Sequence, residues 1–225
     1  WTILRMGHTA KGNKVAPASG AAAGLEVDKL SVAANEHNFH EGLLGHLVER
    51  LGPLMGEAFN CVTLDSWEAG CQTWTKDFAK DFAERRGYDC HKWLIAVTGR
   101  IVGDIDLTER FLWDYRRTAA DLFINNYFVY FKELCEKNGM IMSGETYGNG
   151  NFDVFRAAKI PDVPMCEFWY LEDYDYKTYP TKWPVSLAWP FTKKVVTSAA
   201  HLSGKSIVGA ECPTSKHGWD THPYL

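Results

Sequence analysis

The chain has 225 residues and a formal net charge of −4, from 24 Lys and Arg against 28 Asp and Glu. A mildly acidic chain without a basic run has no electrostatic footprint for nucleic acid or anionic lipid, so we expect neither partner. No apolar stretch approaches the roughly 18 residues of a membrane span. The length suits one ordinary globular domain, and the start at Trp1 rather than Met indicates a piece of a longer protein.

Hydrophobic periodicity predicts alternating strands and helices. In chain order, we expect a strand at 1–7, a loop of small residues at 10–24, a helix at 28–51, a strand at 59–65, helices at 75–86 and 107–138, strands at 140–145 and 162–167, a helix at 191–203 and a strand at 207–211. Leu43, Leu44, Leu47 and Leu51 form the apolar stripe of the first helix. Thr75 is the expected cap of the second helix, and Asp106 with Glu109 has capping-box spacing for the third.

Most of the predicted strands end at or near a carboxylate. These residues are Asp65 with nearby Glu68, then Glu145, Glu167 and Glu211. Because parallel strands joined by helices point their carboxyl ends the same way, the acids would converge on one rim, where (β/α) barrels carry their active sites. The sequence therefore predicts an α/β fold, a partial (β/α)8 TIM-like barrel. A doubly wound open sheet is the alternative, but no G-x-G-x-x-G or phosphate-binding loop follows a strand.

Paired carboxylates flanked by aromatic rings are typical of glycoside hydrolysis. One carboxyl protonates the leaving oxygen while a second attacks the sugar or activates water. Trp67 lies beside Glu68, Tyr147 follows Glu145 by two residues, and these flat rings suit the apolar face of a sugar. The same carboxylate oxygens could bind a divalent cation such as Ca²⁺.

Other chemistries have weaker support. The histidines at 37, 40 and 46 lack the glutamate of an H-E-x-x-H zinc motif, and no G-x-S-x-G elbow is present. The six cysteines form no C-x-x-C pair, so we expect buried small side chains or unpaired thiols.

Several ordered blocks resemble the α-L-rhamnosidases of glycoside hydrolase family 106. They are TLDSWEAGCQTWT at 63–75, RRGYD at 85–89, ERFLWDYR at 109–116, ETYG at 145–148 and PMCEFW at 164–169, with further blocks at 24–30 and 218–224. The resemblance covers nearly the whole chain. It departs from the family pattern at Thr146, where proline is expected, and at Cys166, where glycine is commoner.

The resemblance implies a fold and an activity. Residues 1–24 would be the end of a β-rich insert and a connecting loop, and residues 25–225 the central part of a (β/α)8 catalytic domain that lacks its first and last strands. The implied reaction is removal of terminal α-L-rhamnose from plant-type polysaccharides or glycosides, with inversion and with a bound Ca²⁺. A secreted or periplasmic location in a bacterium is also implied.

The resemblance also suggests site residues. Glu68, Glu145 and Glu167 would be catalytic, with Glu145 or Glu68 as the acid and Glu167 as the base that activates water. Glu211 is the expected metal ligand, and Asp65 would contact metal or sugar hydroxyls. The remaining expected sugar contacts are Trp67, Trp74, Tyr147, Trp169 and His222. Two alternatives stay open, namely a carbohydrate-binding barrel without catalysis and a related hydrolase with another sugar specificity.

Overall fold

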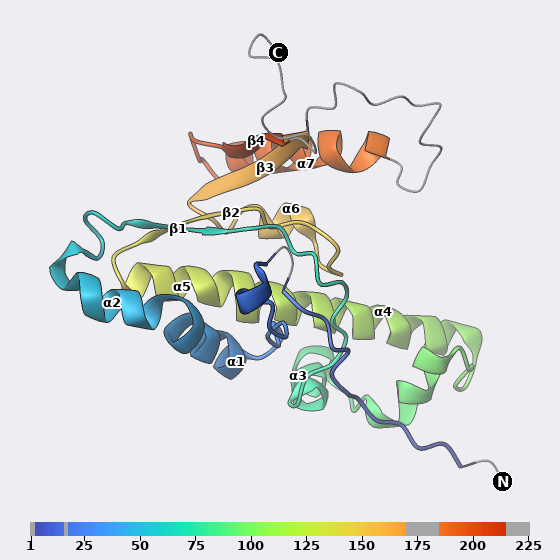
Figure 1. Ribbon diagram of the computed structural model, residues 1–225. Coiled ribbons are helices and arrows are strands. Elements are labelled where there is room, and N and C mark those ends of the chain that lie inside the picture. The colour runs from blue at the N-terminus through green and yellow to red at the C-terminus, as the bar shows by residue number, and fades with distance from the viewer. Residues whose placement is uncertain (1–2, 16–17, 170–184, 215–225) are drawn as a thin grey trace. The chain divides into compact units, whose positions relative to one another are not determined.

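The computed structural model describes residues 3–15, 18–169 and 185–214 (Figure 1). The chain divides into two units that interleave along the sequence. The helical unit comprises Trp1–Pro53, Trp67–Leu134 and Gly148–Asp153, and the sheet unit comprises Leu54–Ser66, Cys135–Tyr147 and Val154–Leu225.

Four parallel strands form the sheet in the order in which they occur in the chain. They are β1 (Cys61–Leu64), β2 (Ile141–Gly144), β3 (Val163–Trp169) and β4 (Gly209–Thr214). Each pairs in parallel with the next, from Cys61 opposite Ile141 to Glu167 opposite Glu211. The four predicted strands from 59 onward are confirmed. A parallel sheet whose strands alternate with helices establishes the α/β class. The strands are neighbours in chain order, as in part of a barrel, whereas an open doubly wound sheet reverses its strand order.

Two helices of the sheet unit, α6 (Val154–Ala157) and α7 (Val185–Leu202), pack against each other, and α7 packs on β3. Their shared core joins Val196 and Ala199 of α7 to Tyr147, Ala158 and Cys166, all of them buried. The small side chain of Ala199 lets α7 approach the sheet closely. Packing of α7 against Tyr147, just after β2, and against Cys166 of β3 stabilises the carboxyl ends of these two strands.

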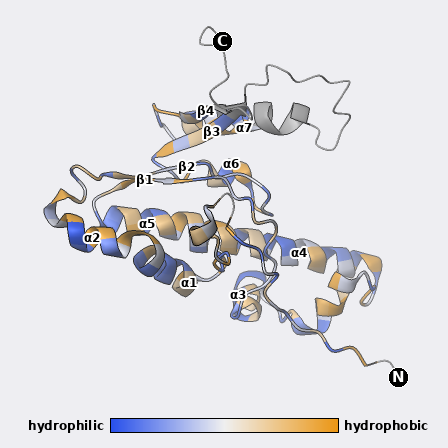
Figure 2. Cartoon of the chain, viewed as in Figure 1, coloured by the Kyte–Doolittle hydropathy of each residue, from blue (hydrophilic) through white to orange (hydrophobic). Residues whose placement is uncertain are grey.

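The helical unit surrounds a core of aromatic rings. Its elements are η1 (Gly20–Ala22), α1 (Val32–His37), the π-helical η2 (Asn38–Leu44), α2 (Gly45–Leu51), α3 (Phe78–Arg86), the 3-10 helix η4 (His91–Thr98), α4 (Ile105–Phe123) and the π-helical η5 (Ile124–Val129). Two further elements, η3 (Gly52–Leu54) and α5 (Tyr130–Lys137), cross from one unit into the other. Phe78, Phe82, Phe111 and Phe123 are fully buried, and Figure 2 shows hydrophobic and hydrophilic residues mixed along α4, as expected of an amphipathic helix.

Buried polar contacts join the helices. The Arg86 guanidinium of α3 donates to the carboxylate of Asp121 over 2.8 Å and to the hydroxyl of Thr118 over 2.9 Å, and both partners lie on α4. The Asn35 amide of α1 donates to the carbonyls of Lys29, Ser31 and Asn126. These contacts fix the angle between helices that apolar packing alone leaves adjustable.

The predicted opening strand is wrong. Residues 3–7 adopt no regular structure, and the only pairing in this part of the described chain is a single antiparallel bridge between Lys14 and Leu25. A strand requires a ladder of hydrogen bonds to a neighbour, and no described segment supplies one for residues 3–7.

Helix boundaries differ from the predictions at the caps. Asp104, rather than Asp106, caps α4 by accepting from the Leu107 amide over 2.8 Å. Asp77 occupies the cap position of α3, while the Thr75 hydroxyl donates to Asp28 instead.

The predicted helix at 28–51 is present but begins later, at Val32, and its leucine stripe is only partly buried. Leu44 is buried, whereas Leu43 and Leu47 are exposed, because the π-helical η2 carries an additional residue per turn and rotates the following face. No helix in the described ranges is long and apolar enough to cross a membrane.

Candidate functional site

Carboxylates gather at the carboxyl ends of the parallel strands. Asp65 directly follows β1, Glu145 directly follows β2, and Glu167 and Glu211 lie opposite each other on β3 and β4. Carboxylate oxygens of Asp65, Glu145 and Glu211 lie within 4.8 Å of one another. The Glu145 amide donates to the Leu64 carbonyl over 2.9 Å, which extends the pairing of β1 and β2 to the acids themselves. Of the acids predicted to converge on one rim, the sheet unit brings together Asp65, Glu145 and Glu211, with Glu167 paired to Glu211, whereas Glu68 belongs to the helical unit.

Glu145 is the most enclosed of these acids. Its side chain is 2 % exposed, and neither carboxylate oxygen has a hydrogen-bond partner among the described residues. The hydroxyls of Thr146 and Tyr147 are also buried and without a partner in that part of the chain. Buried polar atoms almost always have a partner, so this run of three residues has unused capacity to bind a ligand.

Burial and repulsion raise the pKa of Glu145. Desolvation of the carboxyl is the largest cause and raises the pKa to about 7. The hydroxyl of Tyr147 lowers it, while Glu167, Glu211 and Asp65 raise it through like charge. Burial likewise raises the pKa of Tyr147, so this phenol stays protonated.

The donor set of this cluster fits a hard divalent cation. Ca²⁺ prefers several oxygen ligands, and carboxylates are its usual protein ligands. Three converging carboxylates repel one another without a cation, and the unpartnered oxygens of Glu145 can coordinate one. Glu211 was the ligand expected from the sequence and Asp65 was expected to contact metal or sugar hydroxyls, and the geometry adds Glu145 to them.

The other predicted glutamate, Glu68, lies in the helical unit on the segment that follows β1. Its side chain is exposed, while its neighbour Trp67 is buried. The Trp67 indole donates to the Gly70 carbonyl over 2.6 Å and packs edge to face on Phe123. Backbone pairing of Trp67 with Gly148 joins this segment to the one that follows β2.

The predicted sugar contacts lie in different surroundings. Trp67 and Tyr147 are buried, whereas Trp74 is half-buried and stacks on Phe78 with ring centroids 4.7 Å apart. Trp169 is the last residue of β3, where the structure describes only the backbone, and His222 lies outside the described residues.

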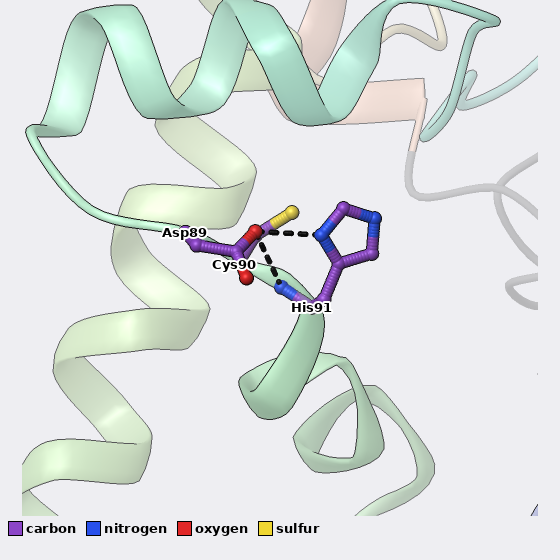
Figure 3. A group of neighbouring side chains, drawn as sticks. All are labelled: Asp89, Cys90 and His91. Carbon is purple, nitrogen blue, oxygen red and sulfur yellow. Dashed lines mark hydrogen bonds and ion pairs between the residues drawn. The ribbon is translucent and has the colours of Figure 1, made fainter.

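A second group of side chains with ligand atoms comprises Asp89, Cys90 and His91 at the start of η4 (Figure 3). The Asp89 carboxylate accepts from the backbone amide of His91 over 3.2 Å and contacts the His91 ring nitrogen at 2.6 Å. This contact holds the pKa of Asp89 below its usual range, and burial raises the pKa of the Cys90 thiol. The adjacency of the three residues in the chain and the contacts between Asp89 and His91 account for this group without a metal ion.

Sequence reasoning missed the buried hydroxyl of Thr146 as a site feature. The only sign of it in the sequence was the threonine at a position where the family pattern has proline, and the sequence does not show whether the hydroxyl is buried.

The histidines at 37, 40 and 46 are all exposed, and they belong to neither group of metal-ligand side chains found among the described residues. None of the six cysteines forms a disulfide, as predicted.

Comparison with known proteins identifies the family. The family model described as alpha-L-rhamnosidase, glycoside hydrolase family 106, matches residues 1–225. A relative from Formosa agariphila named "Putative beta-glucuronidase" is 42% identical over 225 residues, which are 99% of this chain and 18% of that protein. The solved structure of a rhamnosidase from Novosphingobium sp. PP1Y has a TM-score of 0.78 and 30% identity, with coverage of 94% of this chain and 20% of that one. The chain thus spans about a fifth of these relatives, and it belongs to glycoside hydrolase family 106.

Proposed function

We propose that the chain forms part of a glycosidase that removes terminal α-L-rhamnose from polysaccharides or glycosides with inversion. The observation that carries this proposal is the convergence of Asp65, Glu145 and Glu211, with Glu167 paired beside them, at the carboxyl ends of parallel strands. Barrel enzymes carry their active sites at this edge, and glycosidases use carboxylates there. Membership of the rhamnosidase family supports the choice of sugar.

In this proposal Asp65, Glu145 and Glu211 would hold Ca²⁺. When bound, the cation orients sugar hydroxyls and neutralises the carboxylates that surround it. Because Glu145 would be one of these ligands, we assign the role of the acid to another glutamate. Glu68, on the exposed segment after β1, then takes that role.

The chain's own groups supply the proton transfers. Glu167 accepts a proton from the attacking water while the oxygen of that water bonds to the anomeric carbon. Glu68 donates a proton to the glycosidic oxygen as the bond from that carbon to the leaving group breaks. Attack from the face opposite the leaving group inverts the anomeric configuration.

A β-glucuronide is the second candidate substrate, because a relative carries a glucuronidase name. The charge of the site favours the neutral sugar. Four carboxylates at the strand ends repel the carboxylate of a glucuronide, and a single divalent cation neutralises only part of their charge.

The test is hydrolysis of an aryl α-L-rhamnoside by the full-length protein, with an aryl β-glucuronide alongside. We expect turnover of the rhamnoside that falls with a chelator and returns with Ca²⁺, and proton NMR should show the inverted sugar as the first product. Turnover of the glucuronide alone would establish the second candidate. A folded protein that binds the rhamnoside and hydrolyses neither substrate would support a carbohydrate-binding role.

A further inference from the structure

A pocket of about 790 Å³ lies entirely within the helical unit. Three stretches of chain, 6–13, 25–28 and 69–76, form most of its wall, and side chains of η4 and α4 complete it. The volume falls within the roughly 300–1,000 Å³ that is typical of ligand sites. None of the carboxylates assigned to the proposed hydrolysis lines the pocket, so any ligand that it binds is recognised by other groups.

The indole of Trp74 gives the pocket a flat apolar surface. This side chain is half-buried and stacks on the fully buried Phe78, with ring centroids 4.7 Å apart. The ring of His8 lies 5.9 Å from the indole, and Tyr115, which also lines the pocket, donates its hydroxyl to the Thr73 carbonyl over 2.8 Å. These contacts hold the aromatic rings in place, and a fixed aromatic surface suits a ligand with a flat ring.

Both acidic side chains that line the pocket are engaged by the protein itself. Glu26 forms an ion pair with the buried Lys29 over 3.0 Å. Asp28 accepts hydrogen bonds from the Thr75 hydroxyl over 2.7 Å and from the side-chain amide of Gln72. The pair of Glu26 with Lys29 carries no net charge, and the donors around Asp28 stabilise its charge within the wall.

The lysines of the wall are not neutralised in this way. Lys11 and Lys76 both line the pocket, and neither forms an ion pair with any residue that the structure describes. The Lys11 ammonium donates to a carbonyl, that of Cys71, over 3.4 Å. With the Glu26 pair counted as neutral, two lysines against Asp28 leave the wall positive, which favours an anionic ligand.

We propose that this pocket binds a ring that carries a carboxylate, with Trp74 against the face of the ring and Lys11 or Lys76 beside the carboxylate. Two kinds of compound have this chemistry, namely a uronate unit of an acidic polysaccharide and an aromatic acid such as a hydroxycinnamate. A neutral sugar lacks the charge and an inorganic anion lacks the ring, so neither matches both parts of the wall. Binding here goes beyond the proposed hydrolysis, because it uses none of the carboxylates of that reaction.

Calorimetry with the full-length protein tests the proposal. The probes are methyl β-D-glucuronide, 4-hydroxycinnamate and, as the uncharged counterpart of the first, methyl β-D-glucoside. At least one of the two carboxylates should bind, the glucoside should bind at least about tenfold more weakly, and added salt should weaken binding of the carboxylate. Binding of the glucuronide alone would identify a polysaccharide as the source, binding of the hydroxycinnamate alone would identify an aromatic acid, and binding of both would support the shared chemistry.

Two variants locate the bound carboxylate in the pocket. Lys76→Gln should weaken its binding about fivefold, because the change removes a charge at an exposed position where the fold does not depend on it. Trp74→Ala should weaken binding about tenfold through the loss of ring contact. The matched control Lys80→Gln, which removes an exposed lysine of α3 outside the pocket, should leave the affinity unchanged.

Glu167→Gln separates this proposal from the proposed function, because Glu167 belongs to the sheet unit. Binding that persists in Glu167→Gln and falls in Lys76→Gln would support the pocket, whether or not the protein hydrolyses rhamnosides. Binding that Glu167→Gln abolishes and that both pocket variants retain would refute the pocket and leave the hydrolysis intact. The proposal would also be overturned by the absence of binding by both carboxylates, or by a glucoside that binds as tightly as either of them.

Discussion

Replacing Glu145 with glutamine should stabilise the sheet when no cation is present. The pKa of this carboxyl is raised from 4.5 to about 7, so the folded protein binds its proton more tightly than the unfolded chain does. The resulting penalty is absent below pH 4.5, grows as the pH rises towards 7 and is complete above 7. At pH 8 it amounts to about 3 kcal/mol, and Glu145→Gln removes it.

Hydrogen exchange of the β2 amides measures this effect in the full-length protein. With a chelator at pH 8, Glu145→Gln should slow exchange through openings that expose residue 145 by about 100-fold relative to wild type. At pH 4 the two proteins should exchange alike. The control Glu57→Gln, at an exposed position of the same unit, should match wild type at both pH values.

With Ca²⁺ bound, the β2 amides of the wild type should exchange more slowly than those of Glu145→Gln. Wild-type protection should rise with Ca²⁺ concentration, because a ligand that binds only the folded state stabilises it. Glu145→Gln should gain much less protection, since it lacks one of the three carboxylates. Faster exchange of Glu145→Gln in chelator at pH 8 would refute the proposed electrostatic penalty, and an equal gain with Ca²⁺ would refute the ligand role.

Three further changes test other parts of the structure. Glu68→Gln should reduce kcat strongly for alkyl rhamnosides and much less for aryl rhamnosides with acidic phenols, which leave without protonation; equal losses would exclude Glu68 as the acid. Asn35→Ala should lower the free energy of unfolding by about 1–3 kcal/mol, because it removes the side-chain donor of the Lys29 and Asn126 carbonyls and one of the two donors of the Ser31 carbonyl, whereas the exposed Asn38→Ala should have little effect in the same denaturation experiment. Gly148→Ala should destabilise the helical unit, since an added Cβ would lie 2.1 Å from the Trp67 carbonyl oxygen at a φ of +124°; an unchanged melting temperature would show that the Trp67 bridge is dispensable.

The sheet was predictable because its strands are short apolar runs that end in turns or acids. The four strands from Cys61 onward and the carboxylates at their ends follow from that pattern, and so does the meeting of Asp65, Glu145 and Glu211. A parallel sheet imposes this outcome on any residues placed at the ends of its strands.

The errors have local physical causes. Residues 1–7 have a strand-like composition, but pairing depends on a distant partner that composition does not reveal. The capping positions of α4 differ by two residues because Asp104 and Asp106 are both capable caps. Hydrophobic periodicity does not predict the π-helical η2, which exposes Leu43 and Leu47.

The role of Glu145 was open for a different reason. Sequence spacing places a carboxylate at the end of β2, but only burial and its charged neighbours decide whether the carboxylate carries a proton or binds a cation. The buried hydroxyls of Thr146 and Tyr147, which have no hydrogen-bond partner among the described residues, could not be predicted for the same reason, since solvent exclusion is a property of the folded chain.

The interleaving of the two units has a consequence for folding. β1 and β2 are neighbours in the sheet, yet the whole stretch Trp67–Leu134 of the helical unit separates them in the chain. Closing so long an unstructured loop is entropically unfavourable, whereas helices with local contacts form quickly. We therefore expect the helical unit to condense first, which shortens the effective loop before β1 and β2 pair. On that order, a change such as Gly148→Ala would delay sheet formation even though it lies outside the strands.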